Sequence, residues 1–218
     1  MLIDSVVEKR DFWLIYELCK GMTMNEHLWT VKGEFHKKER IYMVNHGSFY
    51  HALRNNFALL KDFIRRVCLV LGMLAKLGIV HADLKPENII LDYNEKDQTI
   101  VSLKVIDLGS CFMLKPDGSR FEGQQEFCSS TPEYLPPEIQ SFLMKRYTQE
   151  RNVKVEDFCR APWIFDMWAV GSILMEVLSG FPLWLSFKSR VVTPDGRSIY
   201  NTGFFGVAGR DNAKILQK

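Results

Sequence analysis

The stretch that decides the fold begins with His81-Ala82-Asp83-Leu84-Lys85-Pro86-Glu87-Asn88 and the apolar run Ile89-Ile90-Leu91; after a polar turn it returns as Leu103-Lys104-Val105-Ile106 and ends in Asp107-Leu108-Gly109. Two short apolar runs that flank a polar turn predict a β-hairpin. One aspartate and one asparagine precede its first strand, and a second aspartate follows its second strand. Because a short hairpin holds its two ends together, we expect these polar side chains to form one site.

The two motifs at the ends of this hairpin resemble a pair found in eukaryotic protein kinases, H-R-D-L-x-x-x-N and D-F-G, with one departure in each. The run from Lys85 to Asn88 resembles the serine/threonine branch of that family. H-x-D and D-x-G each occur by chance in ordinary loops, so the resemblance depends on their joint order with a strand on each side. It implies an α+β protein-kinase-like fold, with a mostly α-helical large lobe and a few small-lobe strands.

The resemblance also implies a chemistry, the transfer of the γ-phosphate of ATP to a protein serine or threonine. This reaction needs an acceptor for the hydroxyl proton, metal ligands and positive charge beside the transferred group. Asp83 would be the base, and Lys85 would contact the γ-phosphate. Asn88 and Asp107 carry the hard oxygen ligands that magnesium takes. The expected cofactors are therefore ATP and Mg²⁺, and the expected partner is a protein substrate.

The first 22 residues resemble a small-lobe strand remnant and the hinge between the lobes. Leu2–Val7 and Phe12–Leu18 are apolar runs separated by charged residues, which predicts an antiparallel hairpin. By resemblance the backbone carbonyl of Glu17 and the backbone amide of Cys19 would bind adenine. Tyr16 would guard the back of that pocket and Ile90 would form its floor. From the residues alone, a strand that leads into a loop and an ordinary core isoleucine remain open as alternatives.

Residues 23–218 resemble an incomplete large lobe, and the chain is expected to be truncated at both ends. Nothing in the sequence resembles the Gly-rich loop, the strand lysine or the helix glutamate of a kinase, and the later large-lobe helices are not recognisable. A catalytically inactive kinase-like module that binds a partner is therefore the alternative to an enzyme. A piece of a longer kinase would reconcile intact catalytic residues with missing parts, and we favour that interpretation.

One long helix is predicted before the catalytic loop. From Phe57 to Leu77 apolar residues recur at helical spacing, Asp62 and Arg66 form a possible i, i+4 pair, and Gly78 supplies a stop. The preceding residues are less informative: Met24–Leu28 could be a short helix, and the charge between Lys32 and Arg40 is typical of a solvated face. His27, His36, His46 and His51 lack the spacing of a metal site.

The segment 107–138 resembles a kinase activation segment that ends in Pro137-Glu138. Thr131 would contact Asp83 and Lys85 and shape the floor for the peptide substrate. Two departures stand out: Ala82 replaces an arginine, and Phe127 replaces a phosphorylatable residue. We therefore expect no phosphorylation switch at position 127, with Ser119, Ser129 and Ser130 as remaining sites. An insertion of about 143–160 follows, whose charged sequence favours a surface helix or loop.

A second long helix is predicted from Trp163 to Leu178, apolar almost all round. Asp166 and Glu176 argue against a membrane span, because ionisable groups are rare inside a bilayer. By resemblance Asp166 accepts backbone hydrogen bonds from the catalytic loop near His81. Glu138 would pair with an arginine, for which Arg190, Arg197 and Arg210 are candidates that the sequence does not distinguish. Turns are expected at Pro194–Gly196 and Gly203, with a short helix beginning near Asp211.

Composition adds limits on function. The 218 residues are 47% hydrophobic with a net charge of +2, which gives no electrostatic reason to expect nucleic acid or membrane binding. Five scattered cysteines suit a reducing compartment, and no signal peptide is recognisable, so we expect the cytoplasm or nucleus. The oligomeric state, the substrate and the regulator are left open.

Overall fold

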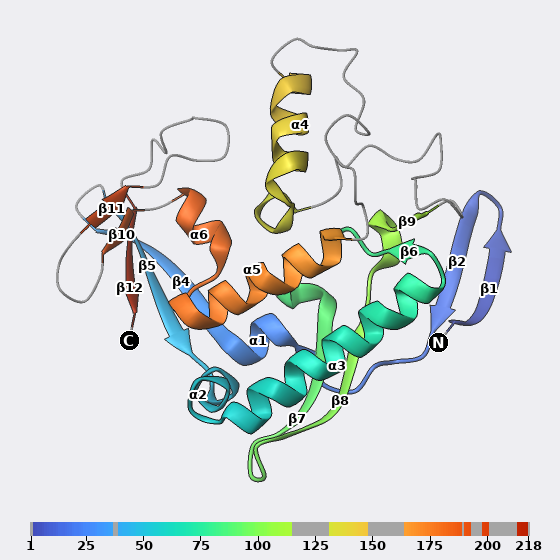
Figure 1. Cartoon of the computed structure of the whole chain (residues 1–218), viewed down its shortest axis with the longest axis horizontal. Coiled ribbons are helices and arrows are strands. Elements are labelled where there is room, and N and C mark those ends of the chain that lie inside the picture. Colours follow the sequence, from blue (N-terminus) through green and yellow to red (C-terminus); the bar gives the residue numbers. More distant parts are fainter. Residues whose placement is uncertain are drawn as a thin grey trace.

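The computed structural model describes residues 2–36, 39–114, 131–147, 164–188, 190–192, 198–200 and 213–217 (Figure 1). In chain order the helices and strands are β1 (Leu2–Glu8), β2 (Asp11–Tyr16), β3 (Met22–Thr23), α1 (Met24–Leu28), β4 (Trp29–His36), β5 (Glu39–His46), α2 (Ser48–Asn55), α3 (Phe57–Lys76), β6 (Ile79–Val80), β7 (Ile89–Asn94), β8 (Thr99–Val105), β9 (Phe112–Met113), α4 (Pro137–Tyr147), α5 (Phe165–Ser179), α6 (Leu183–Lys188), β10 (Arg190–Val192), β11 (Ser198–Tyr200) and β12 (Ala213–Gln217). Within these ranges no helix is both long enough and apolar enough to cross a membrane.

The predicted N-terminal hairpin is confirmed: β1 and β2 pair antiparallel from Leu2↔Tyr16 to Glu8↔Asp11. It lies at one edge of the molecule (Figure 1). The described side chains of both strands are exposed, so neither face of the hairpin packs into a core. The orientation of the hairpin therefore depends on the segment that follows it, the predicted hinge at residues 17–21.

Helix α3 confirms the predicted helix before the catalytic loop. The side chain of Asn56 caps its start by accepting from the Leu59 amide at 3.1 Å, and Gly78 follows its end with φ +68°. The predicted pair is present, with Arg66 Nε 2.7 Å from Asp62 Oδ2. The terminal residue Phe57 is exposed and does not join the core as its spacing suggested.

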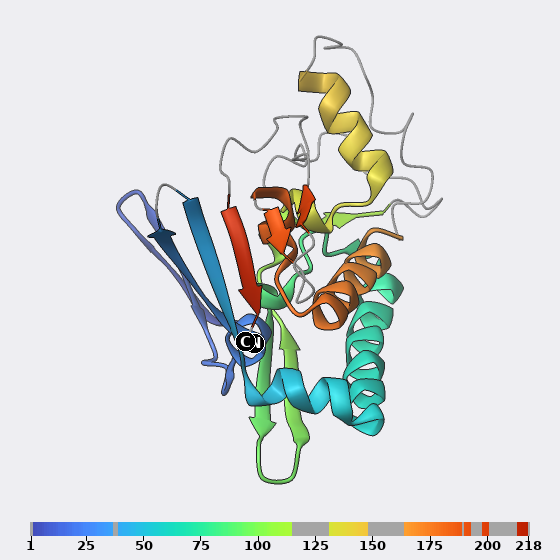
Figure 2. The same cartoon turned by 90° about the vertical axis from the view of Figure 1, so that its left-hand side faces the viewer.

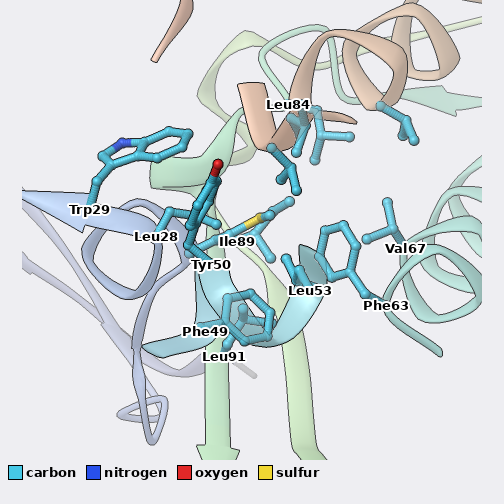
Figure 3. Packing of buried hydrophobic residues seen from close by; sticks show 14 of the residues in the cluster. Leu28, Trp29, Phe49, Tyr50, Leu53, Phe63, Val67, Leu84, Ile89 and Leu91 are labelled. Atoms are coloured by element: carbon cyan, nitrogen blue, oxygen red, sulfur yellow. The ribbon is translucent and has the colours of Figure 1, made fainter. Parts of the chain in front are cut away.

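The main hydrophobic core lies between α3, α2, α1 and the β7–β8 hairpin, with α5 contributing from the other side (Figures 1 and 3). Figure 3 shows Phe49, Leu53 and Phe63 meeting Ile89 and Leu91 of β7. Each of these five residues is at most 1% exposed. This packing anchors the strand that leads out of the catalytic loop, so the core fixes the position of the site.

A five-stranded sheet in the order β11-β10-β12-β5-β4 was not predicted (Figure 2). The charged segment between Lys32 and Arg40 contributes to the β4–β5 hairpin, and the expected short helix near Asp211 is wrong. The chain instead forms β12, which runs parallel to β5 from Ala213↔Arg40 to Gln217↔Val44. Pairing with a distant strand supplies the backbone hydrogen bonds that an isolated one-turn helix would satisfy only in part.

Helix α5 corresponds to the second predicted long helix, two residues shorter at its start and one longer at its end. It ends at Gly180 with φ +82°. One face packs inward with Phe165, Ile173 and Val177, whereas Trp168 on the other face is 43% exposed. The all-round apolar sequence therefore does not correspond to an all-round buried helix in the part of the chain that the structure describes.

Candidate active site

The catalytic loop holds Asp83 in a fixed network with three other predicted site residues. Asp83 Oδ2 accepts from Lys85 Nζ at 2.8 Å and from Asn88 Nδ2 at 3.2 Å, and Oδ1 accepts from the Thr131 amide at 2.8 Å. Lys85 Nζ also donates to Thr131 Oγ1 at 2.6 Å. The contact expected for Thr131 with both residues is therefore present, across 46 to 48 positions of sequence. Asp83 is buried at 5% exposure with its carboxylate held in one orientation.

The backbone of Ile106 ties the catalytic loop to the second aspartate. Its carbonyl accepts from His81 Nε2 at 2.9 Å, and its amide donates to the Asn88 carbonyl at 2.9 Å. The Asp83 amide donates to His81 Nδ1 at 3.3 Å, so the histidine carries its proton on Nε2. Asp107 follows directly with φ +64° and an exposed side chain. The two ends of the hairpin are thus joined, as their sequence positions indicated.

Asp166 on α5 holds the backbone of the catalytic loop in place. Its Oδ2 accepts from the His81 amide at 2.9 Å and its Oδ1 from the Ala82 amide at 3.0 Å, which is the contact expected from the resemblance. Burial raises the pKa of this carboxyl, and the two backbone hydrogen bonds oppose that shift. Ala82 has φ +63°, and the fixed amides hold it in that left-handed conformation.

Ala82, which replaces the arginine of the kinase motif, is packed in a second apolar cluster. It is 5% exposed, and the cluster brings it together with Phe112, Leu135, Ile139 and Phe165. The chain that follows Thr131 is therefore held by apolar packing in the described residues. Phe127, Ser119, Ser129 and Ser130 lie outside those residues, so the expectation about phosphorylation stays a prediction.

The sequence reasoning did not find the surroundings of two glutamates, the buried Glu176 and the partly buried Glu87 of the catalytic loop. Glu176 on α5 is 0% exposed, and its Oε1 accepts from the Tyr134 hydroxyl at 2.6 Å and from the Leu183 amide at 2.7 Å. Burial raises the pKa of Glu176 to about 8. Burial is also the first cause that raises the pKa of Glu87, and nearby Asp83 adds to it. Among the described residues, Oε2 of each glutamate is a buried atom with no hydrogen-bond partner. No local pattern in the sequence indicated that Tyr134 and Leu183 would donate hydrogen bonds to Glu176.

The predicted hinge contacts the three-stranded sheet β3-β7-β8 through the side chain of Glu17. Ile90 is partly buried on β7, whereas its neighbours Ile89 and Leu91 are 0% exposed on the core side. Glu17 is held near this face, because its Oε1 accepts from Lys104 Nζ at 3.2 Å. Cys19 is partly buried in the irregular segment that follows β2. Since Ile90 pairs with Lys104 in β7–β8, the side chain of Glu17 meets the same face of the sheet as Ile90.

Other predicted positions are not brought into the site. Tyr16 is 58% exposed at the end of β2. Glu138 lies half-buried in the first turn of α4, and two of its candidate partners, Arg197 and Arg210, lie outside the described residues. The predicted insertion begins within α4, and its remainder from residue 148 also lies outside them.

Two of the histidines that were considered as metal ligands, His27 and His46, make contacts that stabilise the fold. His27 Nε2 contacts the Leu91 carbonyl at 3.1 Å, and His46 stacks on Tyr50 with ring centroids 4.0 Å apart. In the described part of the chain no group of three histidine, cysteine or acidic residues could hold a metal ion. This finding concerns all-protein metal cages and leaves open a cation that a nucleotide helps to hold.

The residues present fit a magnesium ion whose ligands come partly from the protein and partly from a nucleotide. The amide nitrogen of Asn88 donates to the carbonyl of Asp83 at 2.8 Å and to its carboxylate, so the amide oxygen is the atom available to a cation. Asp107 supplies an exposed carboxylate next to the backbone that Asn88 holds. Magnesium commonly takes one or two such protein oxygens and completes its shell with phosphate oxygens and water.

Phosphoryl transfer needs a proton acceptor, a positive charge and oxygen ligands for a metal ion, and the carboxylates, the lysine and the amide at this hairpin are side chains of those types. This set of side chains in an α+β fold is typical of a phosphoryl-transfer enzyme. The family model described as "Protein kinase domain" matches residues 1–200. The chain belongs to the protein kinase family.

Individual relatives agree with this assignment. The chain is 31% identical over 160 residues to serine/threonine-protein kinase YPK2/YKR2 of Saccharomyces cerevisiae, which covers 70% of this chain and 20% of that protein. It is 27% identical over 179 residues to serine/threonine-protein kinase ATG1c of Arabidopsis thaliana, 82% of this chain and 18% of that protein. It is 30% identical over 158 residues to Aurora kinase of Yarrowia lipolytica, 69% of this chain and 35% of that protein. The chain thus spans about a fifth of the first two relatives.

Proposed function

We propose that this chain is the catalytic part of a protein serine/threonine kinase. The observation that carries the proposal is the network around Asp83, whose carboxylate is fixed by Lys85, Asn88 and the Thr131 amide. A carboxylate held in this way can orient a substrate hydroxyl and accept its proton. The contact of Lys85 with Thr131 places the ammonium between the base and the segment that would carry the peptide substrate.

The other residues have roles in nucleotide binding. Magnesium bound with ATP would neutralise charge on the phosphates, and Asn88 and Asp107 would hold it. Lys85 would offset the negative charge on the transferred group. The hinge backbone at Glu17 and Cys19 would bind adenine above Ile90. His81 and Asp166 would act by positioning the loop, because Asp166 accepts from the His81 amide and His81 Nε2 donates to the Ile106 carbonyl.

Serine and threonine are the substrate residues that the sequence supports best. The run from Lys85 to Asn88 resembles the serine/threonine branch, and two of the relatives named above carry "serine/threonine-protein kinase" in their names. We also propose that the protein acts inside the cell, in the cytoplasm or nucleus. The alternative, an inactive partner-binding module, gains support only from the missing Gly-rich loop, lysine and glutamate. It does not explain why Asp83, Lys85 and Asn88 are held in one network at the hairpin end that Asp107 follows.

The test uses the protein as it occurs in its own cells. An antibody against this chain captures wild-type protein and, from matched cells, an Asp83→Asn variant, and both are incubated with γ-labelled ATP, Mg²⁺ and peptide pools with serine, threonine or tyrosine as the only acceptor. We expect labelled serine or threonine from wild type and a loss of about 10³-fold or more in the variant. Equal labelling by both proteins would contradict the proposal. For the isolated chain we expect weak ATP binding and little transfer.

A further inference from the structure

One ion pair joins the hinge to the strand that leads to Asp107. Lys104 Nζ of β8 lies 3.2 Å from Glu17 Oε1, with the two side chains 39% and 51% exposed. The lysine lowers the pKa of Glu17 through a hydrogen bond and its charge. An exposed ion pair contributes little to global stability. Its importance therefore depends on what its two ends hold in place.

The register of the small sheet places this pair beside the predicted adenine site. Thr23 pairs with Ile90 in β3–β7, and Ile90 pairs with Lys104 in β7–β8. Directly opposed residues of neighbouring strands point to the same face. Since Ile89 and Leu91 occupy the core face, Lys104 shares the other face with Ile90. The Glu17 side chain reaches this face to meet the lysine, so the pair lies at the margin of the proposed floor.

The far end of the hinge is fixed in a different way. Gly21 has φ +103°, and a Cβ at this position would lie 2.0 Å from the Leu91 carbonyl oxygen, so only glycine fits. Between Glu17 and Gly21 the chain forms neither helix nor strand, and Leu18 is 91% exposed. The β1–β2 hairpin is exposed on both faces and gives no packing support. The hinge is therefore attached at two described points, the Lys104 side chain and the backbone of β7.

We propose that Lys104 is a positioning residue for nucleotide binding. By holding Glu17 it sets the direction of the Glu17 carbonyl and the Cys19 amide above Ile90. Lys104 lies on β8, three residues before Asp107, so the strand that leads to a proposed metal ligand also contacts the hinge. The inference rests on the proposed function and adds a residue that family motifs do not include.

The first measurement is the affinity of the chain for a fluorescent adenine nucleotide with Mg²⁺. Lys104→Met and Glu17→Gln should each weaken binding about three- to fivefold, the range of one partly exposed ion pair. The double variant Lys104→Glu with Glu17→Lys should restore the affinity to within about twofold of wild type, because it rebuilds the pair in reverse. Lys96→Met is the matched control, since Lys96 is an exposed lysine in the turn of the same β7–β8 hairpin.

The second measurement is amide hydrogen exchange of residues 17–22 without nucleotide. Both single variants should exchange faster there, and the reversed pair should exchange like wild type. Unchanged affinity in Lys104→Met, or no rescue by the reversed pair, would overturn the positioning role. If the wild-type chain binds no nucleotide, the proposed function fails, and hydrogen exchange alone tests whether the Lys104–Glu17 pair positions the hinge. Faster exchange in the single variants with rescue by the reversed pair supports that role, and equal exchange in all variants refutes it.

Discussion

The buried carboxyl of Glu176 makes the stability of the chain depend on pH in a direction that a substitution can test. The pKa of Glu176 is about 8 in the folded state, against an ordinary value of 4.5. Between pH 4.5 and about pH 8, Glu176 is therefore protonated in the folded chain and ionised in the unfolded chain. Between these values the folded state binds more protons than the unfolded state, so stability falls as the pH rises. Below pH 4.5 the group contributes no pH dependence, and above about pH 8 the loss is complete.

The magnitude follows from the size of the shift. Each pH unit within the window lowers the free energy of unfolding by about 1.4 kcal/mol. Glu176 therefore accounts for a loss of roughly 3 kcal/mol between pH 6 and pH 8, and of about 5 kcal/mol at most over the whole window. Glu176→Gln removes the titration and keeps the acceptor, because an amide oxygen can replace Oε1 in the hydrogen bonds from Tyr134 and Leu183. We expect the free energy of unfolding of the variant to lie within about 1 kcal/mol of the wild-type value at pH 5 and to exceed the wild-type value above pH 8.

The assay is urea unfolding followed by tryptophan fluorescence at several pH values from 5 to 8.5. The difference in the free energy of unfolding between variant and wild type isolates Glu176, because other titrating groups contribute to both proteins. Glu95→Gln is the control, since Glu95 is an exposed carboxylate that contacts Ser48. If wild type and Glu176→Gln lose stability in parallel over this range, Glu176 is ionised in the folded protein and the reasoning is refuted.

Three further substitutions test the fold around the site, each measured by the shift in free energy of unfolding. Asp166→Ala leaves two buried amides without an acceptor and should cost about 2–5 kcal/mol; a cost under 1 kcal/mol would mean that the loop does not need this support. Gly21→Ala should cost more than about 1 kcal/mol, because the added methyl meets the Leu91 carbonyl, and a neutral result would refute the left-handed hinge. Phe63→Ala should cost about 3–5 kcal/mol by opening a cavity in the core, whereas the exposed Phe57→Ala should stay within about 1 kcal/mol.

The sequence predicted what local patterns encode. Helical spacing and a terminal glycine sufficed for α3, and the alternation of apolar runs and a polar turn sufficed for the β7–β8 hairpin. The contacts of Thr131 and Asp166 with the loop could be expected only from the family resemblance, because 46 and more residues separate the partners.

Features that depend on distant pairing were missed. β12 forms because β5, more than 160 residues earlier, offers a parallel edge, and nothing in the five residues of β12 indicates that partner. The burial of Glu176 was missed because a carboxylate in an apolar helix gives no sign of the hydroxyl of Tyr134 that meets it. Both failures have the same physical origin: tertiary contacts decide these positions against their local propensity.

We propose above all that Asp107 and Asn88 hold a metal-bound nucleotide beside Asp83. The most direct test is calorimetric titration of the isolated chain with ATP, with and without Mg²⁺, for wild type and for Asp107→Asn. The account predicts weak binding that requires Mg²⁺ and falls at least tenfold in the variant. Binding of equal strength without Mg²⁺, or in Asp107→Asn, would contradict it.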